Sequence, residues 1–196
     1  MATLCFVPDV RSVDEMTALA FAAGKGDRAA LERFVRGTQR DLWRMIAHFA
    51  GRSLADDLTQ ETYLRALPAL SSFAGRSSAR TWLLSIARRV VVDHLRALTC
   101  RPRVSDAEDW GQVADRRQAA VCAGMAGFEE VVEVGVLLDG MMAERREALV
   151  LTQVIGMSYA EAAEVVGVQI GTIRSRVARA REDLLRAGRY SGQRAS

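Results

Sequence analysis

Residues 158–176 read SYAEAAEVVGVQIGTIRSR, and this stretch has the pattern of a helix-turn-helix. Ala163 is small where two helices would cross, and Gly167 suits the positive backbone angle of the turn between them. Apolar residues follow at the spacing that packs the two helices together: Val166, Val168, Ile173, Val177, Ala180 and Leu184. Three prolines in 196 residues, with abundant Ala, Leu, Glu and Arg, extend the all-α prediction to the whole chain.

The second helix of this motif has an outward face. At about 100° per residue it carries Gly171, Ser175, Ala178, Arg179 and Glu182, flanked by Thr172 and Arg174. The first half of such a helix normally enters the major groove, so Arg174 and Arg179 are candidates for base edges and Ser175 for an adaptable hydrogen bond. Arg176 and Arg181 suit phosphates. The alternative is a solvated face whose arginines pair with Glu182 or Asp183.

The N-terminal half predicts four helices. Ser12 and Glu15 form a capping-box pattern for the first, which ends near Gly24, and Asp27 caps a second to about Ala50. Ser53 caps a third, with Asp56 and Asp57 in its first turn, and it bends or ends near Pro68. After the loop 73–78, the fourth buries one apolar face, namely Trp82, Leu83, Ile86, Ala87, Val90, Val91, Leu95 and Leu98.

Positive charge is concentrated in two blocks. The chain has a net charge of only +3, but residues 76–103 hold seven Arg against Asp93, and residues 170–196 hold seven Arg against two acids. Two separated basic blocks predict two contacts on a polyanion. The loop 73–78 precedes the first block, and its Gly, Ser and Arg suit capture of an unstacked base. For Trp82, both core packing and stacking on a base remain open.

The composition and the motif content argue against several classes of protein. Hydrophobic residues at 49% and charged residues at 26% are typical of a soluble globular protein, and no apolar run predicts a membrane span. Three cysteines without a CxxC pair favour a reducing cytoplasm over a disulfide framework. No GxSxG, P-loop, HExxH or Rossmann fingerprint occurs, so we expect neither an enzyme nor a metal or cofactor.

Three collinear segments then carry a resemblance. Residues 56–66 (DDLTQETYLRA), 73–83 (FAGRSSARTWL) and 86–96 (IARRVVVDHLR) resemble domain two of bacterial extracytoplasmic-function (ECF) sigma factors. Residues 141–185, with RREALVL at 145–151 and GTIRSR at 171–176, resemble domain four. The resemblance covers nearly the whole chain and is closest to the sigma-C group of actinobacteria.

This resemblance implies an all-α fold of two small helical domains joined by a flexible linker. Residues 12–100 would form sigma domain 2, residues 101–127 the linker, which passes toward the polymerase active-site cleft, and residues 128–188 sigma domain 4. The implied partners are core RNA polymerase, through its β′ clamp helices and β flap, and promoter DNA as duplex and single strand. An anti-sigma factor, a common partner in the family, is a further candidate.

The resemblance also assigns site residues. The β′ clamp helices would be bound by Asp57, Gln60, Glu61, Leu64 and Arg65. The minus-ten element, with one base flipped into a pocket, would be bound by Phe73, Gly75, Arg76, Ser77, Ser78, Arg80, Trp82, Arg88, Arg89 and Arg96. The minus-thirty-five element would be bound by Thr172, Arg174, Ser175, Arg176, Arg179 and Arg181.

A different class of protein also fits the helix-turn-helix. In a dimeric transcriptional regulator, the N-terminal half would sense a ligand or dimerise, and only the C-terminal module would contact DNA. That alternative leaves the first basic block and its aromatic loop unexplained, and it predicts a palindromic footprint by the protein alone.

Overall fold

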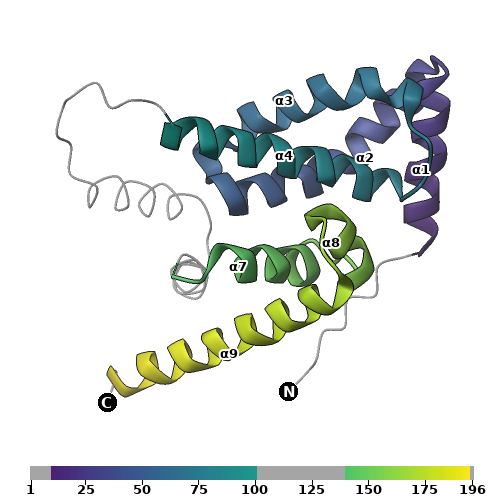
Figure 1. The fold of residues 1–196 in the computed structure, drawn as a ribbon. Coiled ribbons are helices and arrows are strands. Elements are labelled where there is room, and N and C mark those ends of the chain that lie inside the picture. Colours follow the sequence, from purple (N-terminus) through teal and green to yellow (C-terminus); the bar gives the residue numbers. More distant parts are fainter. Residues whose placement is uncertain (1–9, 101–139, 195–196) are drawn as a thin grey trace, which may run out of the picture.

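The computed structural model describes residues 10–100 and 140–194, and every regular element in these ranges is helical (Figure 1). The N-terminal unit comprises α1 (Val10–Gly24), α2 (Arg28–Ala50), α3 (Arg52–Ala69), the short 3-10 turn η1 (Leu70–Ser72) and α4 (Ala79–Cys100). The C-terminal unit comprises α7 (Ala143–Leu149), a π-helical turn η2 (Val150–Val154), α8 (Tyr159–Val166) and α9 (Ile170–Arg194). The predicted all-α fold of two small helical domains is confirmed. The predicted linker 101–127 and the first part of the predicted domain 4, residues 128–139, lie outside the described residues.

Helix α2 begins and ends where its sequence predicts. The side chain of Asp27 accepts a hydrogen bond from the Ala30 backbone N–H at 3.0 Å, which satisfies a free donor of the first turn. Gly51 ends the helix with a φ of +87°, a conformation that favours glycine. Phe34, Leu42, Met45 and Ile46 are fully buried on one face of α2, as its apolar spacing indicates.

Two predicted helix starts are wrong. Helix α1 begins at Val10, so Ser12 lies within it, and Glu15 pairs with Arg33 of α2 at 2.6 Å instead of closing a capping box. Helix α3 begins at Arg52, because the tight reversal at Gly51 places the N–H of Leu54 3.3 Å from the Gly51 carbonyl. Ser53 is therefore inside α3, and Asp56 and Asp57 lie beyond its first turn.

Helix α4 contributes a row of buried residues to the core of the N-terminal unit. Leu83, Leu84, Ala87, Val90 and Val91 of this helix are at most 2% exposed. Leu98, which was expected to be buried, is 45% exposed, because the end of α4 lies at the surface and its residues 96–98 are all exposed. The same helix positions the candidate DNA-binding arginines on its remaining faces.

The C-terminal unit contains the predicted helix-turn-helix. Ser158 and Glu161 form a complete capping box at the start of α8, and Gly167 ends it in the left-handed conformation with φ +76°. Ile173, Val177 and Ala180 of α9 are at most 1% exposed. Helix α9 continues to Arg194, beyond residue 188, where the predicted domain 4 ends.

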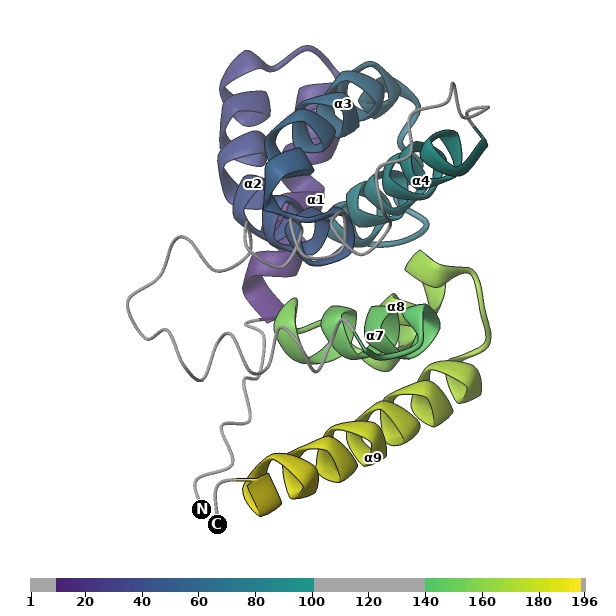
Figure 2. The same cartoon turned by 90° about the vertical axis from the view of Figure 1, so that its left-hand side faces the viewer.

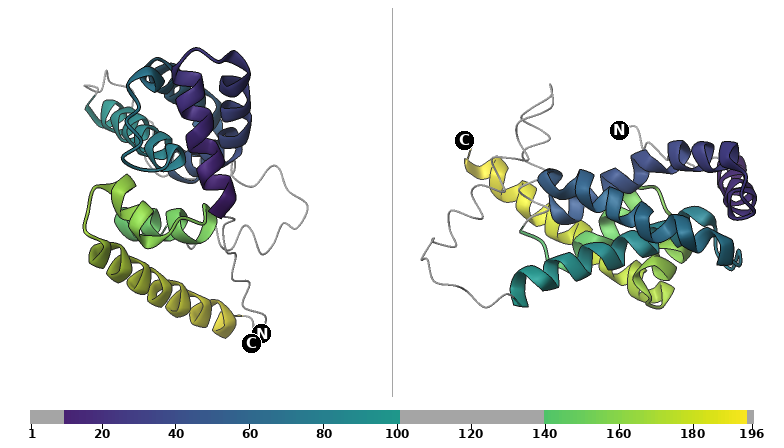
Figure 3. Two further views of the ribbon diagram at one scale, coloured as in Figure 1. Left: turned by 90° about the vertical axis from the view of Figure 1, so that its right-hand side faces the viewer. Right: turned by 90° about the horizontal axis from the view of Figure 1, so that it is seen from above.

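The two units pack against each other through α4 and α8. Figures 2 and 3 show α7 and α8 as a layer between the N-terminal bundle and the long α9. Helix α2 also contacts η2. This packing decides which candidate DNA-binding side chains are accessible in the free chain.

Candidate nucleic-acid interface

The first candidate surface is the outward face of α9. Arg174, Ser175 and Arg179 are exposed; Ser175 and Arg179 lie on the side away from the buried Ile173 and Val177, and Arg174 flanks that side. Within the described residues, the guanidinium groups of Arg174 and Arg179 contact no acidic side chain. The Ser175 hydroxyl donates to the Thr172 carbonyl at 2.9 Å, and Arg181 donates to the Gln153 side chain at 3.2 Å. Arg176 and Thr172 are half-buried.

In the described part of the chain, Arg174 and Arg179 form no ion pair with Glu182 or Asp183, which was the alternative for this face. Asp183 instead accepts a hydrogen bond from Arg145 of α7 at 2.7 Å, which ties α9 to α7. Glu182 is exposed. The exposed side of α9 therefore presents the guanidinium groups of Arg174 and Arg179, which pair with no acidic side chain among the described residues and lie about one and a half helical turns apart. Guanidinium groups suit phosphate oxygens and guanine edges.

The second candidate surface is the loop 73–78. Phe73 anchors its start: it is 8% exposed, and its ring centroid lies 5.1 Å from that of Trp82. Gly75 and Arg76 are exposed at the tip, and Ser77 is half-buried. Ser78 caps α4, since its hydroxyl accepts from the Thr81 N–H at 3.1 Å. Trp82 is thus a half-buried ring packed on the loop anchor.

The arginines of α4 divide into two groups. Arg89 and Arg96 are exposed. Arg80 and Arg88 instead contact the C-terminal unit, where the Arg88 Nε lies 2.6 Å from Glu147 Oε1 and its Nη2 lies 3.2 Å from Oε2. Arg80 pairs with Asp41 of α2 at 2.6 Å and donates to the Ile155 carbonyl at 2.5 Å.

His48 lies near the same boundary between the units. Partial burial lowers its pKa below the ordinary 6.5, and the guanidinium groups of Arg44, Arg146 and Arg52 lower it further. Arg146 belongs to α7, so positive charge from both units acts on this imidazole. The neutral form of His48 is favoured where the units meet.

A third exposed surface lies on α3. Residues Asp57, Gln60, Leu64 and Arg65 are exposed at helical spacing, and Leu64 is 70% exposed. Glu61, half-buried between them, accepts from Arg65 Nε at 2.7 Å, and Arg65 also contacts Asp93 of α4 at 3.3 Å. An exposed leucine within a rim of opposite charges is typical of a protein-binding surface.

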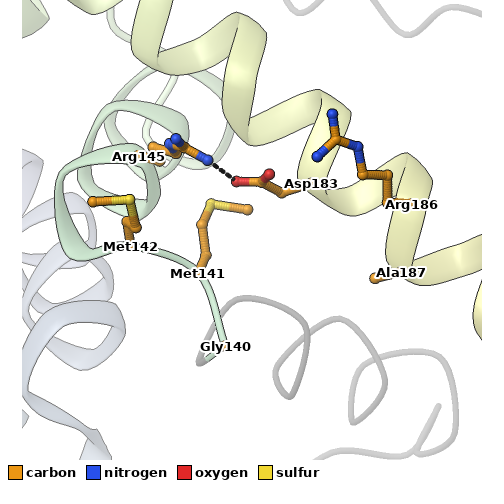
Figure 4. A pocket seen from close by; sticks show the side chains of 7 residues that line it. All are labelled: Gly140, Met141, Met142, Arg145, Asp183, Arg186 and Ala187. Atoms are coloured by element: carbon orange, nitrogen blue, oxygen red, sulfur yellow. Dashed lines mark hydrogen bonds and ion pairs between the residues drawn. The ribbon is translucent and has the colours of Figure 1, made fainter.

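A shallow hollow of about 450 Å³ lies between the start of α7 and α9 (Figure 4). The Arg145–Asp183 ion pair crosses it, beside Met141 and Met142. None of the candidate DNA-binding residues lines it. In the described ranges, no group of three or more His, Cys, Asp or Glu side chains is placed to hold a metal ion. No helix in those ranges has the length and apolarity needed to cross a membrane.

Sequence reasoning missed several residues that organise these surfaces. Glu147 and Asp41, which pair with the α4 arginines, gave no signal because each is one of many surface-type acids. Thr17 and Phe21 of α1 contact Ala79 and Phe73, at the two ends of the loop 73–78, from a helix more than fifty residues earlier in the chain. The one sequence signal for such a contact is a phenylalanine at position 21 among small residues, and no prediction above was based on it.

Comparison with known protein families defines the class of protein to which the chain belongs. Residues 34–100 match the family described as Sigma-70 region 2, and residues 132–184 match Sigma-70, region 4. The first match identifies the N-terminal unit as a sigma-factor region, which replaces its interpretation as the sensing domain of a dimeric regulator.

Similarity to individual proteins places the chain more narrowly within the sigma factors. The chain is 50% identical over 172 residues to the ECF RNA polymerase sigma factor SigC of Mycobacterium tuberculosis, covering 88% of this chain and 90% of that protein. It is also similar to CnrH, solved with the cytosolic domain of CnrY (26% identity, TM-score 0.65, covering 87% of this chain and 95% of that one). The sigma factor RpoE, solved with the anti-sigma factor NepR from Bartonella quintana, gives 25% identity and a TM-score of 0.65, covering 81% and 96%.

The chain therefore belongs to the ECF family of RNA polymerase sigma factors. Members of this family are transcription regulators that act with RNA polymerase, and they are not enzymes in their own right. The two arginine-bearing surfaces and the exposed face of α3 lie within the matched regions.

Proposed function

We propose that this chain binds core RNA polymerase and directs it to promoters by reading two DNA elements. In this proposal domain 2 spans residues 12–100, domain 4 spans 128–188, and residues 101–127 connect them. The observation that carries it is the exposed arginine-bearing surface of α9, where Arg174 and Arg179 pair with no acid of residues 10–100 and 140–194, above a packed helix-turn-helix core. Because its partners are polymerase and chromosomal DNA, the protein acts in the cytoplasm.

The minus-thirty-five element is read as duplex by the start of α9. Arg174 and Arg179 reach base edges, and Ser175 adds an adaptable hydrogen bond. Thr172, Arg176 and Arg181 lie at the margins of this face, where they contact phosphates and set the helix orientation. The polymerase β flap holds this unit at the correct distance from the minus-ten element.

The minus-ten element is read as a single strand by the loop 73–78 and by α4. Gly75 and Arg76 form the exposed tip, which receives one unstacked base, while Ser77, Ser78 and the Phe73–Trp82 pair form its support. In this proposal the backbone of the single strand runs along α4 and contacts Arg80, Arg88, Arg89 and Arg96. Capture of the flipped base stabilises the melted promoter.

The exposed face of α3 docks on the β′ clamp helices of the polymerase. Leu64 supplies the apolar centre, and Asp57, Gln60, Glu61 and Arg65 supply the polar rim. Fixing both units on one enzyme makes two separately weak DNA contacts act together, because the second contact becomes intramolecular.

In the free chain the two helical units are packed together, and they must separate before the chain binds the minus-ten element. Arg88 is paired with Glu147 and Arg80 with Asp41 and Ile155, so these two arginines are not available to phosphates while the units are packed together. Binding to the polymerase separates the units, which frees Arg88 from Glu147 and removes the contact of Arg80 with Ile155, while the Arg80–Asp41 pair lies within the N-terminal unit. We include an anti-sigma factor among the proposed partners, since RpoE was solved with one.

Run-off transcription with purified core polymerase tests the proposal. On fragments of the source genome, we expect discrete transcripts only when core polymerase and this protein are both present. Their start sites then define the two promoter elements. A symmetric footprint by the protein alone, without any polymerase-dependent transcript, would overturn the proposal.

A further inference from the structure

Helix α1 holds both ends of the loop 73–78, although the proposed function gives this helix no role. The Thr17 hydroxyl oxygen accepts a hydrogen bond from the backbone N–H of Ala79, the first residue of α4, at 3.1 Å. At the other end, the ring centroid of Phe21 lies 5.2 Å from that of Phe73, with the planes tilted by 42°. Phe21, Phe73 and Trp82 thus form a row of rings from α1 to α4.

The tip of the loop lies directly against the Phe21 ring. Gly75 has a φ of +64°, in the left-handed region that disfavours residues with a side chain. A Cβ at this position would lie 2.6 Å from Cζ of Phe21 and 3.2 Å from its Cε2. The backbone of Gly75 therefore rests on the ring edge, and glycine is required there for both its conformation and its lack of a side chain.

Phe21 is more exposed than its neighbours on α1, which indicates a role outside the bundle core. The side chain is 40% exposed, whereas Leu19 and Ala20, its neighbours on α1, are at most 7% exposed and belong to the core. Phe21 therefore lies at the edge of the bundle core. Its ring packs against Phe73 and Gly75, the anchor and the tip of one loop.

We propose that Phe21 is a positioning residue for the minus-ten loop, holding Gly75 in its left-handed conformation so that the loop tip, Gly75 and Arg76, meets an unstacked DNA base. This inference rests on the proposed function of the loop. A loop held in its binding conformation before DNA arrives loses less conformational entropy when it captures the base. Removing the ring does not alter the residues that contact DNA, but it removes the contact that holds them in position.

The test uses holoenzyme assembled with core polymerase and a fluorescent single-stranded oligonucleotide. The oligonucleotide carries the non-template minus-ten sequence upstream of a start site mapped by run-off transcription. We expect Phe21→Ala to weaken its binding roughly 3- to 10-fold, the range that an aromatic pair contact represents. Phe21→Tyr keeps the ring and retains wild-type affinity. Affinity for core polymerase and for a minus-thirty-five duplex stays unchanged in both variants.

A double-mutant cycle separates positioning from general stability. Gly75→Ala alone suffers the strained φ and the collision with Phe21, whereas in the Phe21→Ala background only the strain remains. We therefore expect the combined loss of oligonucleotide affinity to be smaller than the product of the two single losses. Independent losses, or a lowered melting temperature with unchanged oligonucleotide affinity, would overturn the inference. If wild-type holoenzyme fails to bind the oligonucleotide, the proposed function of the loop itself is wrong.

Discussion

Arg88 of α4 and Glu147 of α7 form a two-point ion pair between the two helical units, with Arg88 Nε 2.6 Å from Glu147 Oε1. The side chains are 28% and 14% exposed, so water screens the pair only in part. The guanidinium that the minus-ten proposal assigns to DNA is thus occupied by a carboxylate of the same chain. A carboxylate and a DNA phosphate offer Arg the same kind of oxygen partner, so the two compete.

Glu147→Gln should strengthen binding of the free chain to the single-stranded minus-ten oligonucleotide. Loss of the carboxylate charge frees Arg88, and we expect about a fivefold gain, the size of a partly exposed ion pair. Fluorescence anisotropy measures it. Glu144→Gln, on the same helix but exposed, is the matched control. Equal affinities for wild type and both variants would show that the pair does not compete with DNA.

Arg174→Ala should reduce initiation at promoters that depend on the minus-thirty-five element. Loss of a base contact costs about 1–3 kcal/mol and relaxes sequence preference. Arg181→Ala should instead weaken binding to all sequences and lower the salt slope by about 1, as loss of one phosphate contact does. Arg186→Ala is the control, since Arg186 is an exposed arginine further along α9. Unchanged initiation from Arg174→Ala would remove α9 from the reading surface.

Glu61→Arg should weaken binding to core polymerase. The substitution reverses one charge of the α3 face and also breaks the 2.7 Å pair with Arg65. The double variant Glu61→Arg/Arg65→Glu restores the intrahelical pair while keeping the charge pattern reversed, so we expect it to remain defective. Competition against wild type for core polymerase measures both. Recovery in the double variant would mean that only local helix stability had been lost.

Thr59→Val should raise the melting temperature. The Thr59 hydroxyl oxygen is buried and has no hydrogen-bond partner among the described residues, so its removal avoids a desolvation cost of about 1 kcal/mol. Thr62→Val on the same helix is the contrasting variant, because the Thr62 hydroxyl donates to the Leu58 carbonyl at 2.7 Å. We expect that variant to lose about 1 kcal/mol. Thermal unfolding that ranked the two variants in the opposite order would contradict this account.

Stability should fall as the pH drops below 6.5, in part through His48. Its pKa is lowered in the folded chain by partial burial and by Arg44, Arg146 and Arg52, so the unfolded chain binds the proton more readily. The loss begins near the unfolded pKa and grows until the folded pKa is reached. Melting temperatures between pH 7.5 and 5.5 measure this slope, which should be shallower in His48→Gln. An identical slope in the variant would assign it to other groups.

Local patterns sufficed for much of this fold. The capping residue Asp27, the left-handed Gly167 and the apolar spacing of α9 predicted their helices, because each acts within a few residues of chain. The predictions failed at Ser12 and Ser53, where contacts from outside the pattern override a local cap: Arg33 draws Glu15 away, and the reversal at Gly51 starts α3 early.

The sequence by itself determined that the chain is helical, that residues 158–176 form a helix-turn-helix and that Arg174, Ser175 and Arg179 share an exposed face, because the period of a helix sets which side chains lie together. Only the tertiary structure decided that Arg88 meets Glu147, that Arg80 reaches Ile155 and that Phe21 supports Gly75. Such partners lie more than fifty residues apart, and their meeting depends on the register in which whole helices pack, which no short-range pattern encodes.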